Sequence, residues 1–276
     1  MGLDKINQEK VIEKYAGQLR KLCDRIPGHF EEEDIHDWRV NYKKLRAFLR
    51  MVTTGIDGHL PVMTSEFKKI YAAAGQVREL QLFLATLKSS ATLDLKALPV
   101  YHHHLEKQLF AAKEEFIKRT DVFSFEKETD RWMLMLPEYL NDKTVRDFVQ
   151  KKITAIRLLL LVTEEDEHLH SIRKNLKDII YNIRTFGNVW GISFPVIGWK
   201  SEKQLAEIAE ELGAYNDRCN ALVHFEENIL ATLPEEETLL LQKHRDSLLL
   251  EKNIFREQLL AQLKELILLK EARIER

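Results

Sequence analysis

The chain of 276 residues is 45% hydrophobic and 31% charged, which is enough for one large core or two small ones and excludes a disordered chain. Its formal net charge of −2 excludes a polycation, so any anion-binding surface must come from charge segregated to one part of the molecule. Only 10 Gly and 6 Pro favour a helical protein with few turns.

Apolar residues recur at three- and four-residue spacing through nearly the whole chain, and no convincing alternating strand appears. In chain order this pattern predicts helices at about 7–26, 33–53, 64–89, 98–121, 142–162, 165–189, 201–231 and 235–272. Segments rich in turn-forming residues separate them, and one of these, Gly187–Trp199, carries two tryptophans to which we assign no role. The fold class is therefore all-α.

The two sets of four predicted helices contain an internal repeat. The stretch that begins at His36 aligns with the stretch that begins at His170, at an offset of 134 residues. The pairs that coincide are Arg39 with Arg173, Lys43 with Lys177, and Arg50 with Arg184. Further on, Gly75 aligns with Gly213 and Glu79 with Asp217, at an offset of 138. We therefore expect one domain, residues 1–276, built from two pseudo-symmetric four-helix halves at about 1–138 and 139–276.

The first aligned helix carries a stripe of cations on one side. At about 100° per residue, all five lie within a sector of about 80° that borders the apolar face of the helix. They are His36, Arg39, Lys43, Arg46 and Arg50. The second helix repeats the arrangement with His170, Arg173, Lys177 and Arg184, and with Lys174 at the edge. Because the cations border the apolar faces, we expect them to line a basic groove or channel where the two helices approach each other.

This charge is unfavourable without a partner. Like charges three or four residues apart destabilise a helix by about 0.2–0.5 kcal/mol per pair, and neither sector contains an Asp or Glu. Arg supplies forked donors for phosphate, Lys a mobile charge, and His a cation that phosphate keeps protonated. The stripe from His36 to Arg50 extends over about 21 Å, a length that fits an extended polyanion better than a single phosphate.

Two structural alternatives remain open at this point. The stripe could be an ordinary solvated helix face, although its duplication with the same histidine argues against this. The acidic runs near Glu31 and Glu164 could also supply carboxylate partners.

These residues resemble the CHAD family, the conserved-histidine α-helical domain. The resemblance rests on His36-x-x-Arg39-x-x-x-Lys43-Lys44-Leu45-Arg46, on the matching motif from His170 to Lys177 with Tyr181 after it, and on two glycine-containing elements, Gly75–Glu79 and Leu212–Asp217. It covers essentially the whole chain. It implies a fold of two four-helix bundles around a basic channel, with inorganic polyphosphate as the ligand. Asp178 and Ile180 depart from the family pattern, which often has basic residues there.

The expected function is non-catalytic binding of inorganic polyphosphate. The predicted binding residues are His36, Arg39, Lys43, Arg46, Arg50, His170, Arg173, Lys177 and Arg184, with Arg78 and Lys174 as secondary candidates. The alternatives are nucleic-acid binding, which the net charge disfavours, and an enzyme that processes polyphosphate or triphosphate. No catalytic motif is present, no cofactor is expected, and the sequence names no protein partner.

The histidines at Tyr101–His104 invite a metal site, but neighbouring residues on a helix point about 100° apart and cannot readily chelate one ion. We expect no metal. Met1–Lys10 lacks the apolar core of a signal peptide, and the aliphatic run Leu158–Val162 is too short to span a membrane. We therefore expect a cytoplasmic protein with no membrane contact, reduced thiols at Cys23 and Cys219, and an association with polyphosphate granules.

Overall fold

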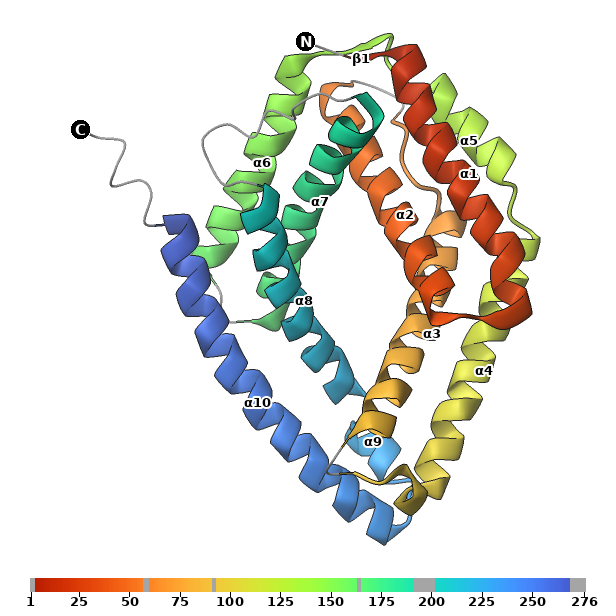
Figure 1. Cartoon of the computed structure of the whole chain (residues 1–276), viewed down its shortest axis with the longest axis vertical. Helices are drawn as coiled ribbons and strands as arrows, with labels where there is room; N and C mark the ends of the chain where they lie inside the picture. Colours follow the sequence, from red (N-terminus) through yellow and green to blue (C-terminus); the bar gives the residue numbers. More distant parts are fainter. Residues whose placement is uncertain (1–2, 57–59, 91–92, 163–164, 191–201, 269–276) are drawn as a thin grey trace. The chain divides into compact units, whose positions relative to one another are not determined.

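The computed structural model describes residues 3–56, 60–90, 93–162, 165–190 and 202–268 (Figure 1). Apart from one pair of two-residue strands, its regular elements are helical, so the all-α prediction is confirmed. The α-helices are α1 (Lys5–His29), α2 (Glu32–Val52), α3 (Ser65–Ser89), α4 (Pro99–Asp121), α5 (Phe125–Leu134), α6 (Asp142–Leu161), α7 (Asp166–Trp190), α8 (Glu202–Val223), α9 (Glu227–Leu230) and α10 (Glu235–Leu268). Short 3₁₀ turns occur at η1 (Thr53–Gly55) and η2 (Leu95–Ala97), and β1 (Leu3–Asp4) pairs antiparallel with β2 (Tyr139–Leu140).

Most predicted helix bounds agree with the structure to within three residues, but three features differ. Helix α1 continues through Pro27 and ends at His29. The next residue, Phe30, has a positive φ of 50°, and its backbone N–H donates to the Ile26 carbonyl. Helix α5 was not predicted, although Ser124 caps its first turn. The predicted helix at 201–231 is interrupted after Val223, because Phe225 turns into the core. A separate short helix, α9, begins at Glu227. Of the turn-rich segment Gly187–Trp199, residues 191–199 lie outside the described residues.

The described chain divides into two compact units, and each draws on three separated segments. Unit 1 comprises residues 1–81, 108–152 and 178–200, and unit 2 comprises residues 82–107, 153–177 and 201–276. This division reflects packing and does not test the sequence repeat, whose boundary near residue 138 stays a prediction.

Unit 1 is held together by an aromatic core. Helix α1 packs against α2 and α5 (Figure 1), and Trp38 of α2 meets Phe67 and Phe116 edge-on at 6.1 and 5.8 Å between ring centroids. Edge-to-face pairs of this kind stabilise a core by about 0.5–1.5 kcal/mol beyond the burial of their area. The start of the chain is fixed by the buried amide of Gln8, which donates to the carbonyls of Leu3 and Pro137. The contacts of Trp38 with Phe67 and Phe116 therefore anchor helix α2 along its apolar face.

Unit 2 is built around the packing of α8 against α10 (Figure 1). Asp166, at the start of α7, accepts hydrogen bonds from Tyr215 of α8 and from Lys252 of α10, the latter at 2.6 Å. Burial opposes ionisation of Asp166, but the bonds from Lys252 and Tyr215 outweigh it and lower the pKa of the carboxyl group. One carboxylate thus ties together three helices of this unit.

A second carboxylate of unit 2 caps a helix. Glu237 of α10 is only 4% exposed and accepts the backbone N–H groups of Val100 and Tyr101, at 3.0 and 2.9 Å, in the first turn of α4. These amides have no partner within their own helix, and the positive end of the helix dipole favours a carboxylate there. In the described part of the chain, no helix is both long enough and apolar enough to cross a membrane.

The Glu237 cap gives a test of this packing. Glu237→Ala is expected to lower the free energy of unfolding by about 1–2 kcal/mol or more, because it removes a helix cap and leaves two buried amides without acceptors. Urea unfolding followed by circular dichroism measures the change. The matched control is Glu236→Ala, which removes an exposed carboxylate from the same first turn of α10 and should change stability by less than about 0.5 kcal/mol. Equal effects in the two variants would show that the cap contributes nothing.

Candidate anion-binding site

The cations of α2 lie beside helix α3 within unit 1. The guanidinium group of Arg39 lies over the ring of Tyr71, 4.5 Å from its centroid, and donates a hydrogen bond of 3.0 Å to the Tyr71 carbonyl. Gly75, one turn further along α3, makes room for it, because a Cβ there would lie 2.7 Å from Nη1 of Arg39. The sequence alignment had identified both Arg39 and Gly75, and the structure shows that they are in contact.

Arg46 shares the same aromatic surface. Its guanidinium group lies 5.4 Å from the Tyr71 ring centroid and 5.8 Å from that of Tyr42, and the two rings stack at 4.2 Å. The buried Nε of Arg46 has no hydrogen-bond partner. A cation over an aromatic face gains about 0.5–1 kcal/mol at exposed sites and about 2 when desolvated. Ring faces therefore stabilise cations for which the sequence indicated no partner.

His36 and Lys43 complete what we call the α2–α3 basic cluster: His36, Arg39, Lys43 and Arg46, with Tyr71 between the arginines. Partial burial lowers the pKa of His36 from its usual 6.5, and the nearby Arg78 and Lys43 lower it further. Glu33 and Asp37 act in the opposite direction but do not outweigh these effects. These surroundings therefore favour the neutral form of His36, and an approaching anion would favour its protonated form.

The cations at the start of α7 lie beside α8 within unit 2. Arg173 packs against Gly213, where a Cβ would lie 3.3 Å from Nε and Nη2, and its buried Nε has no hydrogen-bond partner. His170 forms a hydrogen bond with Asn216, while burial and then Lys174 lower its pKa. We call His170 and Arg173 the α7–α8 basic cluster. Its contacts give the element Leu212–Asp217 a physical role, since the glycine admits the arginine and the asparagine orients the histidine.

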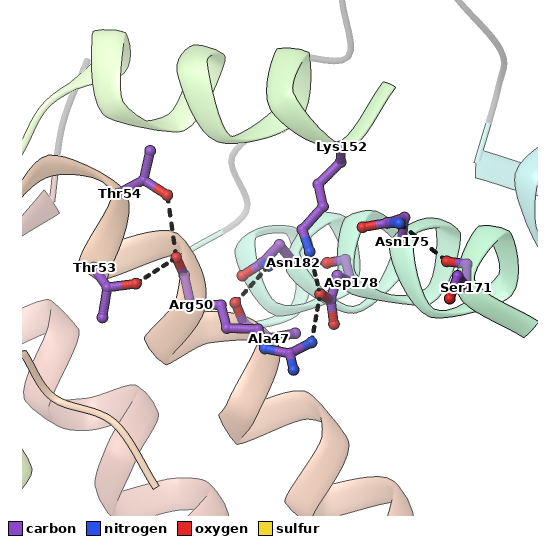
Figure 2. A network of polar contacts seen from close by, with 9 residues as sticks. All are labelled: Ala47, Arg50, Thr53, Thr54, Lys152, Ser171, Asn175, Asp178 and Asn182. Atoms are coloured by element: carbon purple, nitrogen blue, oxygen red, sulfur yellow. Dashed lines mark hydrogen bonds and ion pairs between the residues drawn. The ribbon is translucent and has the colours of Figure 1, made fainter. Parts of the chain in front are cut away.

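Several predicted site residues form ion pairs with carboxylates. Arg50 donates to Asp178 of α7 at 3.0 Å, and Lys152 of α6 donates to the same carboxylate at 2.7 Å. Figure 2 shows Asp178 between the two cations, with the Asn182 amide directed at the Ala47 carbonyl beside it. The Asp178 side chain is only 3% exposed and is therefore held by its two cations, whereas the Arg50 side chain remains 45% exposed. The residue that departs from the family pattern therefore helps to fix α7 against α2 and α6 in unit 1.

Carboxylates also pair with Lys177, Lys174 and Arg78. The pairs are Lys177 with Glu210 at 2.8 Å, Lys174 with Glu167 at 3.3 Å, and Arg78 with Glu32 at 3.0 Å. Glu167 continues the acidic run near Glu164 and pairs with Lys174, so the structural alternative is correct at the edge of the second stripe; Glu164 itself lies outside the described residues. Glu32, from the run near Glu31, pairs with Arg78, which lies on α3 outside the stripe. Carboxylates of other helices, or of another face of the same helix, therefore balance part of the positive charge. Among the described residues, Arg39, Arg46 and Arg173 form no ion pair with a carboxylate.

Arg184 lies in a different place from the other predicted residues. It lines a cleft of unit 1 together with Lys14 of α1 and Lys44 of α2, away from Tyr71. The groove predicted between the two cation-bearing helices concerns the relation between the two units and stays a prediction.

The histidines after Tyr101 have separate surroundings. The buried Tyr101 hydroxyl donates to the His224 carbonyl at 2.7 Å, and His102 lies 3.6 Å from Glu106 one turn along α4. Among the described residues, no three metal-ligating side chains come together.

The fold and the two clusters define the class of this protein: an all-α protein in which an arginine of each histidine-bearing helix packs against a glycine of the next long helix. The chain belongs to the CHAD domain family, whose model matches residues 13–226. The structure is also similar to the crystal structure of the CHAD domain from the plant Ricinus communis. The TM-score is 0.74, with 98% of this chain and 94% of that chain covered at 16% identity, so this likeness concerns the fold. No curated protein matches the sequence.

Gly75 gives a test of the α2–α3 basic cluster. In a helix, Ala is favoured over Gly by about 1 kcal/mol, so Gly17→Ala in α1, where a Cβ meets open space, should stabilise the protein by up to that amount. Gly75→Ala should stabilise it less or destabilise it, by a difference of about 1–2 kcal/mol, because the new Cβ displaces Arg39 from Tyr71. Urea unfolding measures both variants. In an Arg39→Ala background the two glycine substitutions should become equivalent, and a difference that persists there would contradict the assignment.

Proposed function

We propose that this protein binds inorganic polyphosphate without cleaving it, through the α2–α3 basic cluster, and that the α7–α8 basic cluster binds the same class of ligand. The observation that carries the proposal is how Arg39 and Arg46 are held. The carbonyl and ring of Tyr71 hold their guanidinium groups, where carboxylates would have neutralised them. Their positive charge therefore remains for a ligand.

The geometry of the α2–α3 basic cluster suits an extended phosphate chain. From His36 to Arg46 the helix extends over about 15 Å, so the cluster is long enough to contact several phosphate groups of one chain. Arginines already fixed against Tyr71 lose little side-chain entropy on binding. Their forked N–H donors match phosphate oxygens, and each charge-assisted hydrogen bond contributes about 1.5–3 kcal/mol before desolvation is counted.

Family membership and charge support the same reading. The CHAD resemblance implied polyphosphate from the sequence motifs alone, and the net charge of −2 disfavours a general nucleic-acid binder. We also propose that binding is the whole function and that the protein works in the cytoplasm, where its two free thiols, Cys23 and Cys219, would stay reduced. Nucleic-acid binding and phosphate release are separate outcomes of the experiment below.

Polyphosphate binding tests the proposal directly. Long-chain polyphosphate should raise the melting temperature, because it binds the folded protein, and its affinity should fall steeply between two salt concentrations. Arg39→Gln should weaken binding by on the order of tenfold and Arg173→Gln by a smaller factor, as measured by isothermal titration calorimetry. The matched control is Arg146→Gln, which removes the same charge from an exposed position on α6.

Three results would contradict this assignment. Equal affinities in the Arg39 and Arg146 variants would show that binding follows net charge rather than the cluster. Stronger binding of DNA in direct competition would favour the nucleic-acid alternative. Release of orthophosphate from the polymer in the presence of a divalent metal would show an enzyme.

Affinity should also depend on pH through His36 and His170. Both pKa values lie below 6.5 in the free protein, and a bound phosphate would raise them by stabilising the imidazolium. The gain in affinity is therefore complete below the pKa of the free protein and is lost as pH rises through the pKa of the complex. Titrations between about pH 5.5 and pH 8 measure this slope. The His36→Gln/His170→Gln double variant controls for titration of the ligand itself, and an unchanged slope in that variant would rule out the histidines as its source.

A further inference from the structure

A cleft of about 300 Å³ lies in unit 1 between α1, α2 and the end of α7, on a different face of α2 from the α2–α3 basic cluster. The residues that line it are Lys14, Tyr15, Gln18, Asp37, Val40, Asn41, Lys44 and Arg184. Its volume is at the lower end of the range for small-molecule sites and equals the space of roughly ten water molecules. The cleft therefore has room for a few phosphate groups and excludes a bulky ligand.

The charge of the cleft is predominantly positive. Three cations, Lys14, Lys44 and Arg184, face one carboxylate, Asp37, which leaves two positive charges in excess. Burial lowers the pKa of Lys44, and Lys14 and Arg184 lower it further, while Asp37 opposes them without restoring the usual value. The cations thus come from three helices of the unit and repel one another where they converge.

One side of the cleft is fixed in position. Tyr15 is buried, and its hydroxyl lies 2.9 Å from the Thr185 hydroxyl, which joins α1 to α7 beside Arg184. The ammonium groups of Lys14 and Lys44 lie 5.8 and 6.0 Å from the Tyr15 ring centroid, so the same ring positions both lysines. The side-chain amides of Gln18 and Asn41 add neutral donors at the edge.

From this cleft we infer a second anion site, separate from the α2–α3 basic cluster, that binds a small polyvalent phosphate-bearing anion. A phosphate group carries about −1.5 to −2 at neutral pH, so one such group matches the excess charge in a compact volume. A single carboxylate supplies only half of that charge. The inference stands on the residues of the cleft and does not rest on the proposed function. The same chemistry could come from a free oligophosphate or from the end of a longer chain.

Pyrophosphate is the probe for the first experiment, with readout by NMR of the Gln18 and Asn41 side-chain amides, which report on the cleft alone. Pyrophosphate should shift both signals in a saturable way. Lys14→Gln and Arg184→Gln should each weaken the fitted affinity by on the order of tenfold. Lys21→Gln, which removes the same charge from an exposed position of α1 outside the cleft, should leave it within about twofold. An unsaturable shift, or equal losses in the Lys14 and Lys21 variants, would overturn the inference.

A second arm distinguishes the two sources of phosphate and separates this site from the proposed function. In the Arg39→Gln/Arg173→Gln double variant, pyrophosphate should still shift the Gln18 and Asn41 amides with unchanged affinity. Loss of those shifts would show that the cleft is not an independent site. Short polyphosphate chains whose affinity per chain end equals that of pyrophosphate would show that the cleft binds the end of a chain. An affinity that falls as the chain lengthens would show that the cleft binds a free small anion. If calorimetry detects no binding of long-chain polyphosphate while pyrophosphate still shifts these amides, the proposed function is wrong and the inference of this second site is supported.

Discussion

The structure depends on how α2 tolerates four cations and a histidine on one side. Repulsion between like charges costs about 0.2–0.5 kcal/mol per neighbouring pair, while a cation held over a ring gains about 0.5–2 kcal/mol. Tyr71 lies between Arg39 and Arg46 and stabilises both. Because these contacts are of the same order as the repulsion, the cluster can persist in the free protein. A ligand is therefore not needed to hold the helix together, and it meets arginines that are already in position.

Arg50 shows the other solution to the same problem. It pairs with Asp178, which also binds Lys152, so this end of the stripe contributes to the packing of α2 with α7 and α6 in unit 1. The two solutions have different consequences. A ring face leaves the field of a cation largely intact toward solvent, whereas a buried carboxylate reduces it. Arg46 therefore keeps its positive charge available to solvent, whereas the charge of Arg50 contributes to the packing of helices.

Local patterns predicted local features, and features that depend on distant residues were missed. Helical periodicity gave most helix bounds, and the aligned arginines and glycines, Arg39 with Gly75 and Arg173 with Gly213, are in contact. Tyr71 gave no signal, because its importance comes only from lying beside Arg39 across two helices. The carboxylate partner of Arg50 was missed for the same reason, since a helical wheel shows one helix and Asp178 approaches from another. Phe225 interrupts a periodic pattern because burial against Phe83 outweighs helix propensity.

The aligned positions also show that the two clusters are chemically unequal. At the offset of 134, Lys44 aligns with Asp178 and Arg46 with Ile180, and at the offset of 138 Tyr71 aligns with Ala209. Asp178, Ile180 and Ala209 are all buried. The second set has therefore exchanged an arginine and its aromatic support for core packing, and Arg173 keeps its glycine contact without a ring beneath it. Since a ring both fixes a guanidinium group and stabilises its charge, the α2–α3 basic cluster should supply most of the anion-binding free energy, with the α7–α8 basic cluster adding a weaker contact.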